Sequence, residues 1–319
     1  MDTLGTMFMP PAVSTYAQDV DALFYFILYV SIFFFALIVG AMIFFAVKYH
    51  RKKGDVTVPD GPSHNTVLET AWIAIPVIIV TIIFFWGFKG YLKMSVVPAN
   101  AMEIKVTGQK WFWTFNYPDG QMTTNELVVE VDKPVKLLMS SKDIIHAMFI
   151  PAFRLKRDVL PNRYSITWFE ATQIGDYHLF CAEYCGTSHS KMIGTVKVRS
   201  SSDYAEWLES LDTAGEGMSP AEYGEKLFVS RACNTCHRLD DIIGSGPDLT
   251  GIFGHEVELN DGTTITADEN YIRESILDPM SKVVVGYQPV MPTFQGILKD
   301  REVDALIAYV KSLGGEKDE

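Results

Sequence analysis

Two long apolar runs near the start of the chain constrain its fold more than any other feature. Residues 22–47 and 70–88 contain no charged side chain. A helix rises about 1.5 Å per residue, so each run can cross the hydrocarbon core of a bilayer, which is about 30 Å thick. A buried helical hairpin in a soluble protein is the alternative, but both runs reach membrane length. The sequence therefore predicts two membrane-spanning helices.

Positive charges in the loop between the two runs indicate the orientation. Lys48, Arg51, Lys52 and Lys53 follow the first run. Cytoplasmic loops of membrane proteins are enriched in such residues. The loop is therefore expected in the cytoplasm, with both termini on the outer face. In a bacterium, this predicts an inner-membrane protein with two spans and a large periplasmic region.

Length and charge indicate further domains behind the hairpin. Among the 319 residues, residues 1–200 carry 18 basic and 16 acidic side chains, whereas residues 201–319 carry 9 and 23. Such an acidic region repels nucleic acid and favours a basic partner. The predicted divisions are a tail and hairpin at 1–95, a second domain at 96–200, a linker at 201–217 and a third domain at 218–319.

The second domain has the pattern of an all-β fold. Its β-rich runs cover residues 102–106, 111–117, 127–131, 135–139, 164–169, 177–181 and 193–198. Turn signals separate them, among them Pro118, Asp119 and Gly120. Short strands at this spacing predict a β-sandwich or a small barrel.

A cluster of soft metal ligands lies in the segment CAEYCGTSHSKM. Its donors are Cys181, Cys185, His189 and Met192, and His146 lies upstream. Thiolate, imidazole and thioether donors suit copper rather than magnesium or calcium. Two cysteines on one loop can bridge two metal ions, with one histidine terminal to each. A zinc site gains little from Met192, and a disulfide leaves the histidine and methionine unexplained.

The third domain contains the signature of covalent haem attachment. Cys233, Cys236 and His237 form a C-x-x-C-H motif, in which the thiols bind the haem and the histidine binds iron. A thioredoxin-like pair or half of a zinc site is the alternative, but the sequence has no second CxxC. A downstream methionine, Met280 or Met291, is expected as the sixth iron ligand.

The chain resembles subunit II of haem-copper cytochrome c oxidases. The resemblance rests on the hairpin, GQKWFWTFNY, DIIHAMFIPAFRLKRDVLPNRY and CAEYCGTSHSKM, and covers residues 20–200. It implies a cupredoxin-like Greek-key barrel with a dinuclear copper A centre. The implied copper ligands are His146, Cys181, Cys185, His189, Met192 and the backbone carbonyl of Glu183. The resemblance also places the Glu183 carboxylate near a magnesium ion at the interface with subunit I.

Two further residues acquire roles from this resemblance. Trp111 alternates with Trp113 and Phe115 on one strand face, for which ordinary barrel core is the alternative. The resemblance implies instead that Trp111 lies at a docking surface and passes electrons towards copper. It also aligns VLETAWIAIP with a segment whose glutamate, here Glu69, lies at the entrance of a proton path into subunit I. An interfacial carboxylate that faces lipid headgroups is the alternative for Glu69.

The third domain resembles an all-α class I cytochrome c. The segment YQPVMPTFQGIL matches the ligand loop of that family, so Met291 is favoured over Met280 as the axial ligand. Pro247 matches the proline whose carbonyl accepts the proton of the haem histidine. Apolar residues between Val303 and Leu313 recur at helical spacing, and this last helix is expected to pack on the first helix of the domain.

The complete pattern resembles a multidomain subunit II with a fused cytochrome c, the caa-type arrangement. Electrons would pass from cytochrome c or another periplasmic donor to haem c, then to copper A, and then to haem in subunit I. Oxygen would be reduced to water in subunit I, with proton pumping. The implied partners are subunit I, other oxidase subunits and membrane lipid, with no nucleic acid.

Two other functions remain open on the sequence. The chain could serve a copper A nitric oxide reductase, from which the metal content and oxygen consumption of the partner subunit would distinguish it. It could also be a membrane-anchored copper and haem carrier without a catalytic partner. Glu183 between the two cysteines and the long apolar spans argue against a carrier, because they indicate a partner within the membrane.

Overall fold

The computed structural model describes residues 5–51, 53–54, 61, 64–118, 120–212, 215–239 and 244–314. Lys52 in the expected cytoplasmic loop, Asp119 in a predicted turn, residues 213–214 of the linker and residues 315–319 of the third domain lie outside this description. The chain forms two compact units, Met1–Pro98 with Ala152–Arg154, and Ala99–Pro151 with Leu155–Glu319.

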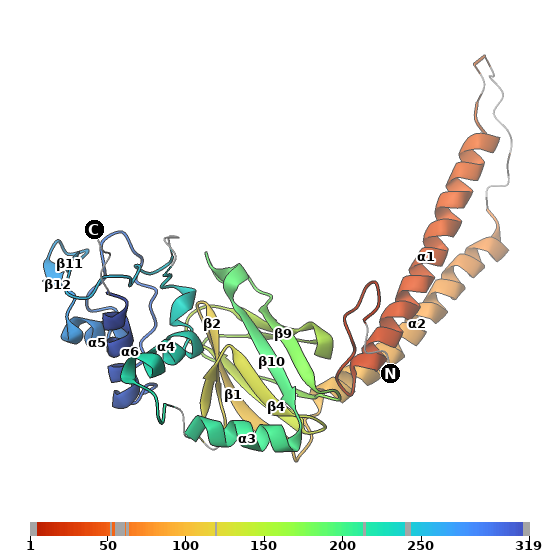
Figure 1. The fold of residues 1–319 in the computed structure, drawn as a ribbon. Coiled ribbons are helices and arrows are strands. Elements are labelled where there is room, and N and C mark those ends of the chain that lie inside the picture. The colour runs from red at the N-terminus through yellow and green to blue at the C-terminus, as the bar shows by residue number, and fades with distance from the viewer. Residues whose placement is uncertain are drawn as a thin grey trace. The chain divides into compact units, whose positions relative to one another are not determined.

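Two long helices, α1 (Ala17–Lys48) and α2 (Thr66–Ser95), dominate the first unit (Figure 1). Both are long and apolar enough to cross a membrane, and the most apolar window of each contains no buried residue in the part of the chain that is described. Such extended apolar surfaces require lipid or a protein partner. The prediction of two membrane-spanning helices is confirmed, and both helices extend beyond the uncharged runs.

Charged side chains at one end of the hairpin hold the first unit together. Lys93 of α2 forms an ion pair of 2.6 Å with Asp19 of α1. Arg154 binds Asp21 through two hydrogen bonds, of 2.7 Å from Nε and 2.8 Å from Nη2. Since Arg154 also donates to the backbone carbonyl of Pro10 over 2.7 Å, it fixes the segment that precedes α1.

The second domain is built from two five-stranded sheets, ordered β3-β2-β1-β5-β8 and β4-β10-β9-β6-β7. The strands are β1 Met102–Gln109, β2 Phe112–Asn116, β3 Met122–Thr124, β4 Glu126–Glu130, β5 Pro134–Ser141, β6 His146–Ile150, β7 Leu155–Val159, β8 Ser165–Glu170, β9 Gly175–Cys181 and β10 Ile193–Arg199. Short helical turns η1 (Pro151–Phe153) and η2 (His189–Lys191) lie between strands. Fully buried Trp113, Phe115 and Leu137 belong to the core. The all-β, cupredoxin-like prediction is confirmed.

Three of these strands were not expected from the sequence: β3, β6 and β7. β3 has only three residues. β7 reads LKRDV, and its three central side chains are exposed and charged, so it lacks the alternation that marks a half-buried strand. β6 pairs with both β7 and β9, and its first residue is the predicted ligand His146.

Most of the expected linker is a helix, α3 (Ser201–Asp212). The ring of Trp207 on α3 meets Tyr117 of the barrel domain edge-on, with centroids 5.2 Å apart. Tyr204 packs beside Trp207 and contacts the sulfur of Met102. Aromatic contacts of this kind stabilise the docking of an amphipathic helix, so the segment that remains as linker is shorter than 201–217.

The third domain contains α4 (Pro220–Ser230), η3 (Cys233–Thr235), β11 (Glu256–Glu258), β12 (Thr264–Thr266), α5 (Glu269–Leu277) and α6 (Asp300–Ser312). Helices α4 and α6 cross closely at Gly224, where a Cβ atom would lie 2.0 Å from the carbonyl oxygen of Ala305. The rings of Phe228 and Tyr309 pack across the same interface at 5.3 Å. The prediction that the last helix packs on the first helix of this domain is confirmed.

Candidate functional site

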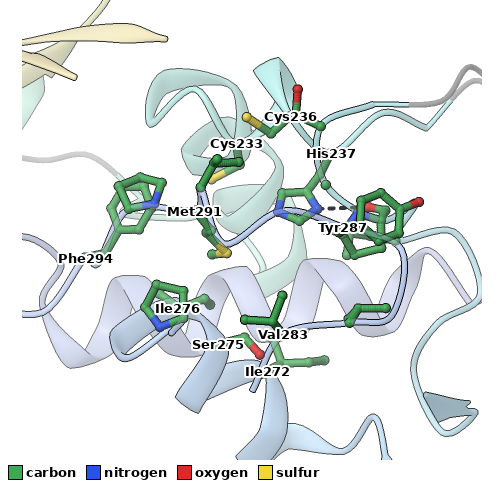
Figure 2. A pocket seen from close by; sticks show the side chains of 18 of the residues that line it. Cys233, Cys236, His237, Ile272, Ser275, Ile276, Val283, Tyr287, Met291 and Phe294 are labelled. Carbon is green, nitrogen blue, oxygen red and sulfur yellow. Dashed lines mark hydrogen bonds between the residues drawn. The ribbon is translucent and has the colours of Figure 1, made fainter. Parts of the chain in front are cut away.

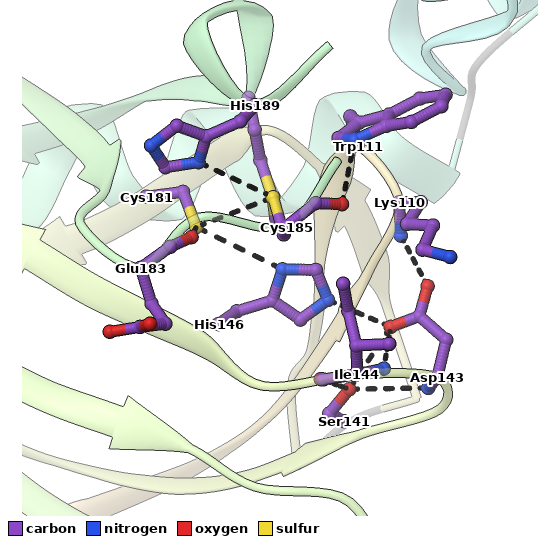
Figure 3. Close-up of polar contacts among 11 residues, drawn as sticks. Lys110, Trp111, Ser141, Asp143, Ile144, His146, Cys181, Glu183, Cys185 and His189 are labelled. Atoms are coloured by element: carbon purple, nitrogen blue, oxygen red, sulfur yellow. Dashed lines mark hydrogen bonds and ion pairs between the residues drawn. The ribbon is translucent and has the colours of Figure 1, made fainter. Parts of the chain in front are cut away.

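The predicted copper ligands converge at one end of the second sheet (Figure 3). His146 begins β6 and Cys181 ends β9, and the pairing of Met148 with Cys181 brings these two strands together. Cys185 lies in the loop that follows β9, and His189 begins η2. The sheet therefore joins a histidine from one strand to a ligand loop more than thirty residues later.

The two cysteines form the centre of this cluster. Their Sγ atoms are 3.8 Å apart, and both thiols are free. His146 Nδ1 lies 3.8 Å from the sulfur of Cys181, and His189 Nδ1 lies 3.4 Å from that of Cys185. Each sulfur therefore has its own imidazole, as expected if the two sulfurs bridge a pair of metal ions.

A weaker donor lies beside each sulfur as well. The thioether sulfur of Met192 is 3.8 Å from Cys185 Sγ, and the backbone carbonyl oxygen of Glu183 is 3.3 Å from Cys181 Sγ. The Glu183 carboxylate points away from the sulfurs and is exposed (Figure 3). Soft sulfur and borderline nitrogen donors predominate in this set, so the residues fit copper.

The two thiols differ in acidity. Burial opposes ionisation of Cys181, but the hydrogen bond with His146 lowers its pKa to about 7. Burial and the neighbouring charge of Cys181 raise the pKa of Cys185 to about 12. Metal binding requires both as thiolates, so it must release protons.

Trp111 lies against the copper loop, which is the loop between Cys181 and His189. Its indole Nε1 donates to the backbone carbonyl of Cys185 over 3.1 Å, and a Cβ atom on Gly186 would lie 3.3 Å from the indole. The resemblance implies an exposed docking residue, whereas Trp111 is only 4% exposed here. Trp111 contacts the loop through its indole N–H, whereas Trp113 belongs to the barrel core and packs against the ring of His146 with centroids 5.9 Å apart.

An apolar pocket in the third domain contains the C-x-x-C-H motif (Figure 2). Cys233, Cys236, His237 and Met291 all line it. Apolar side chains supply most of the remaining wall, among them Ile272, Ile276, Phe294, Leu306 and Val310. A pocket of this composition fits the hydrophobic ring of a haem.

The orientation of His237 suits an iron ligand. Its Nδ1 lies 2.9 Å from the carbonyl oxygen of Pro247, so donation there leaves Nε2 available to a metal. Burial lowers the pKa of His237, which favours the neutral form that a metal requires. The ring also needs Gly246, where a Cβ atom would lie 2.7 Å from it.

The two candidate axial methionines lie in different environments. Met291 lines the pocket, whereas Met280 lies outside the pocket wall and is 56% exposed. The structure thus brings only Met291 into the pocket that contains His237.

Glu69 lies in the first turn of α2 and takes part in capping that helix. Its Oε1 accepts a hydrogen bond of 3.1 Å from the backbone N–H of Asn65. The side chain of Asn65 accepts in turn from the N–H of Leu68 over 3.1 Å. These bonds satisfy helix-end donors and give Glu69 a structural role.

One polar group at the copper site, the carboxylate of Asp143, is not predicted from the sequence. Asp143 lies three residues before His146, and its carboxylate faces the imidazole Nε2 at 2.8 Å. The signal that could have indicated it is the acidic residue at this short spacing, since metal-binding histidines commonly donate their second N–H to a carboxylate.

Three family models match separate parts of the chain. Residues 3–89 match the transmembrane domain of cytochrome c oxidase subunit II, and residues 121–199 match the periplasmic domain of the same subunit. Residues 221–314 match cytochrome c. The three matches follow the order hairpin, barrel and helical domain.

Curated relatives support the same grouping. The cytochrome c oxidase subunit 2 of Alkalihalophilus pseudofirmus is 31% identical over 288 residues, which cover 86% of this chain and 82% of that protein. The corresponding protein of Cereibacter sphaeroides is 31% identical over 245 residues, which cover 64% and 80%. Among solved structures, the periplasmic domain of subunit II of cytochrome oxidase of Bradyrhizobium japonicum is 32% identical, with a TM-score of 0.36, and is covered to 98%, against 37% of this chain.

Proposed function

The chain belongs to the cytochrome c oxidase subunit II family, and on that premise we propose that it passes electrons from a covalently bound haem c to a dinuclear copper A centre and on to haem in subunit I. The observation that carries this proposal is the arrangement of the sulfurs of Cys181 and Cys185, each with its own histidine. A site for a single metal ion does not require two sulfurs that each have their own imidazole.

His146, Cys181, Glu183, Cys185, His189 and Met192 would hold the copper ions. When bound, the copper pair supplies one-electron transfer with little change in geometry. The strands contribute rigidity, because His146 and Cys181 are anchored on neighbouring strands and are buried. A preorganised ligand set keeps the site in one geometry through both redox states.

Cys233 and Cys236 would form the covalent attachment to haem, with His237 and Met291 as axial ligands. A thioether ligand and an apolar pocket both favour ferrous iron, which suits a high-potential electron carrier. The Pro247 carbonyl orients His237, and Gly246 leaves room for its ring.

A short route through Phe112 and Trp111 would connect the two cofactors. Both the barrel and the third domain belong to the second compact unit, and Phe112 of β2 is among the residues that line the haem pocket. Its neighbour Trp111 donates to the carbonyl of Cys185. These contacts support electron transfer from haem to copper within this chain.

The tether between the two domains favours this transfer. With α3 docked on the barrel, the connection is limited to the few residues between Asp212 and Pro220. Short tethers give effective concentrations of about 1 mM or more, so a weak contact between the domains suffices. The acidic charge of residues 201–319 would attract a basic electron donor, with an affinity that falls as salt is added.

The remaining assignments extend from the chain to its assembly. The hairpin would pack against subunit I, with the loop after α1 in the cytoplasm and both termini in the periplasm. The exposed Glu183 carboxylate would approach a magnesium ion at that interface, and Glu69 would lie at the entrance of a proton path. Oxygen reduction and proton pumping would take place in subunit I.

Purification in mild detergent tests the assembly. We expect a complex that contains a second subunit with its own haem and copper. This complex should consume oxygen and show the optical spectrum of haem c. A chain that purifies alone would contradict the proposal in favour of a carrier. A complex that reduces nitric oxide but not oxygen would contradict it in favour of a nitric oxide reductase.

A further inference from the structure

Asp143 joins the copper site to the segment that precedes Trp111. Its carboxylate is partly buried, with 27% of the side chain exposed. Oδ1 accepts from His146 Nε2 at 2.8 Å, from the backbone N–H of Ile144 at 2.6 Å and from the Ser141 hydroxyl at 3.1 Å. Oδ2 accepts from the backbone N–H of Lys110 at 2.7 Å (Figure 3).

The first oxygen determines the orientation of the His146 ring. A carboxylate only accepts hydrogen bonds, so Nε2 must be the donor. The other ring nitrogen, Nδ1, then faces the sulfur of Cys181 at 3.8 Å. The carboxylate therefore fixes the direction of the ring before any metal binds.

The second oxygen acts on the opposite side of the site. Lys110, whose N–H it accepts, immediately precedes Trp111 in the chain. Trp111 in turn donates to the carbonyl of Cys185. The sulfurs of Cys185 and Cys181 are in contact, so a closed ring of interactions runs from Asp143 through both segments and back through His146.

We propose that Asp143 is a positioning residue that fixes the ring orientation of His146 and holds Trp111 against the copper loop. One carboxylate thereby sets both the metal ligand and the residue through which electrons arrive. This inference rests on the proposed function, because the contacts of Asp143 with His146 and Lys110 share one role only if copper binds here and electrons arrive through Trp111.

The test uses the full chain in detergent without copper, so its result does not depend on metal loading. Nitrogen NMR of ¹⁵N-histidine protein reports the hydrogen-bonded Nε2–H of His146, whose signals are identified by their loss in His146→Gln. Fluorine NMR of fluorotryptophan protein reports the surroundings of Trp111, whose signal is identified in Trp111→Phe.

Asp143→Ala is expected to lose the signature of the hydrogen-bonded His146 Nε2–H and to shift the Trp111 signal. Asp143→Asn offers one acceptor oxygen instead of two, so it should retain one of the two signatures and lose the other. Asp158→Asn removes an exposed carboxylate from β7 and should change neither signal.

Wild-type signals for both residues in Asp143→Ala would overturn the positioning role. If Asp143→Ala does not fold, wild-type signals for both residues in Asp143→Asn would do the same. Copper content is measured separately on loaded wild-type chain. A chain whose His146 Nε2–H is hydrogen-bonded but that binds no copper would overturn the proposed function while the role of Asp143 stands.

Discussion

The indole N–H of Trp111 donates to the backbone carbonyl of Cys185 over 3.1 Å. Trp113, in the barrel core, packs edge-on against the ring of His146, with centroids 5.9 Å apart. Trp111 instead contacts the residue that supplies one of the two central sulfurs. This contact relates the residue that immediately precedes β2 to the copper loop and is the basis for the prediction about electron transfer.

Loss of one bridging sulfur should destroy the dinuclear copper centre. In oxidised wild-type protein, we expect an electron paramagnetic resonance signal split equally by two copper nuclei, because two bridging thiolates delocalise the unpaired electron. Cys185→Ser should abolish this signal and leave the haem spectrum intact. Ser190→Ala, an exposed change in the same segment, is the control. A signal from a single copper nucleus in wild-type protein would rule out the dinuclear assignment.

The axial ligand of the haem iron can be assigned by replacing each of the two methionines with alanine in a separate variant. Met291→Ala should remove the weak absorption band of thioether ligation near the red end of the visible spectrum. It should also lower the reduction potential, because a soft donor favours ferrous iron. Met280→Ala should change neither quantity, because that side chain lies outside the pocket. The reverse outcome would transfer the ligand role to Met280.

The close crossing of α4 and α6 should tolerate no side chain at Gly224. A Cβ atom there would meet the backbone of Ala305, which cannot move independently of α6. Gly224→Ala should therefore lower the free energy of unfolding of this domain by about 1–3 kcal/mol. Chemical denaturation followed by haem absorbance measures this, with the exposed Lys226→Ala as control. Equal stability of the two variants would contradict the close contact.

The N-terminus of α4 should respond to acid through Glu222. Hydrogen bonds from the backbone and hydroxyl of Ser219 lower the pKa of Glu222. A lowered pKa in the folded state means that its stabilising effect is present above the unfolded value of about 4.3 and is lost as pH falls through the folded value. Melting temperatures should decline less steeply below about pH 4.3 in Glu222→Gln than in wild-type protein. The exposed Glu225→Gln, which leaves the cap intact, is the control for a change of charge on α4. Identical curves for Glu222→Gln and wild-type protein would contradict the capping role.

Short-range features of this chain were predictable, because their information lies in local spacing. The apolar runs have membrane length, and four copper donors lie within a twelve-residue segment. Asp143 and Trp111 illustrate the limit, since their contacts depend on how β2, β6 and β9 come together. The spacing between Asp143 and His146 allows the contact, but only the fold brings Lys110 to the other carboxylate oxygen.

Long-range context also explains why the sequence contains little sign of strand β7 and helix α3. β7 is the edge strand of its sheet, and its three consecutive central residues are charged and exposed, so its pattern resembles a loop. α3 resembles a polar linker because most of its side chains are polar, although Tyr204 and Trp207 pack on the barrel domain and Ser201 donates to Glu130. In both segments, tertiary contacts determine the structure against a weak local signal.

Flash reduction of haem in the purified oxidase complex tests the central claim most directly. Haem absorbance and the near-infrared band of copper are followed together in wild-type protein, in Trp111→Ala and in the control Trp207→Ala. Haem should be re-oxidised as copper is reduced, and Trp111→Ala should slow this step strongly while both static spectra remain unchanged. Haem that stays reduced while copper is reduced by another route, or transfer at the wild-type rate in Trp111→Ala, would contradict the proposed path.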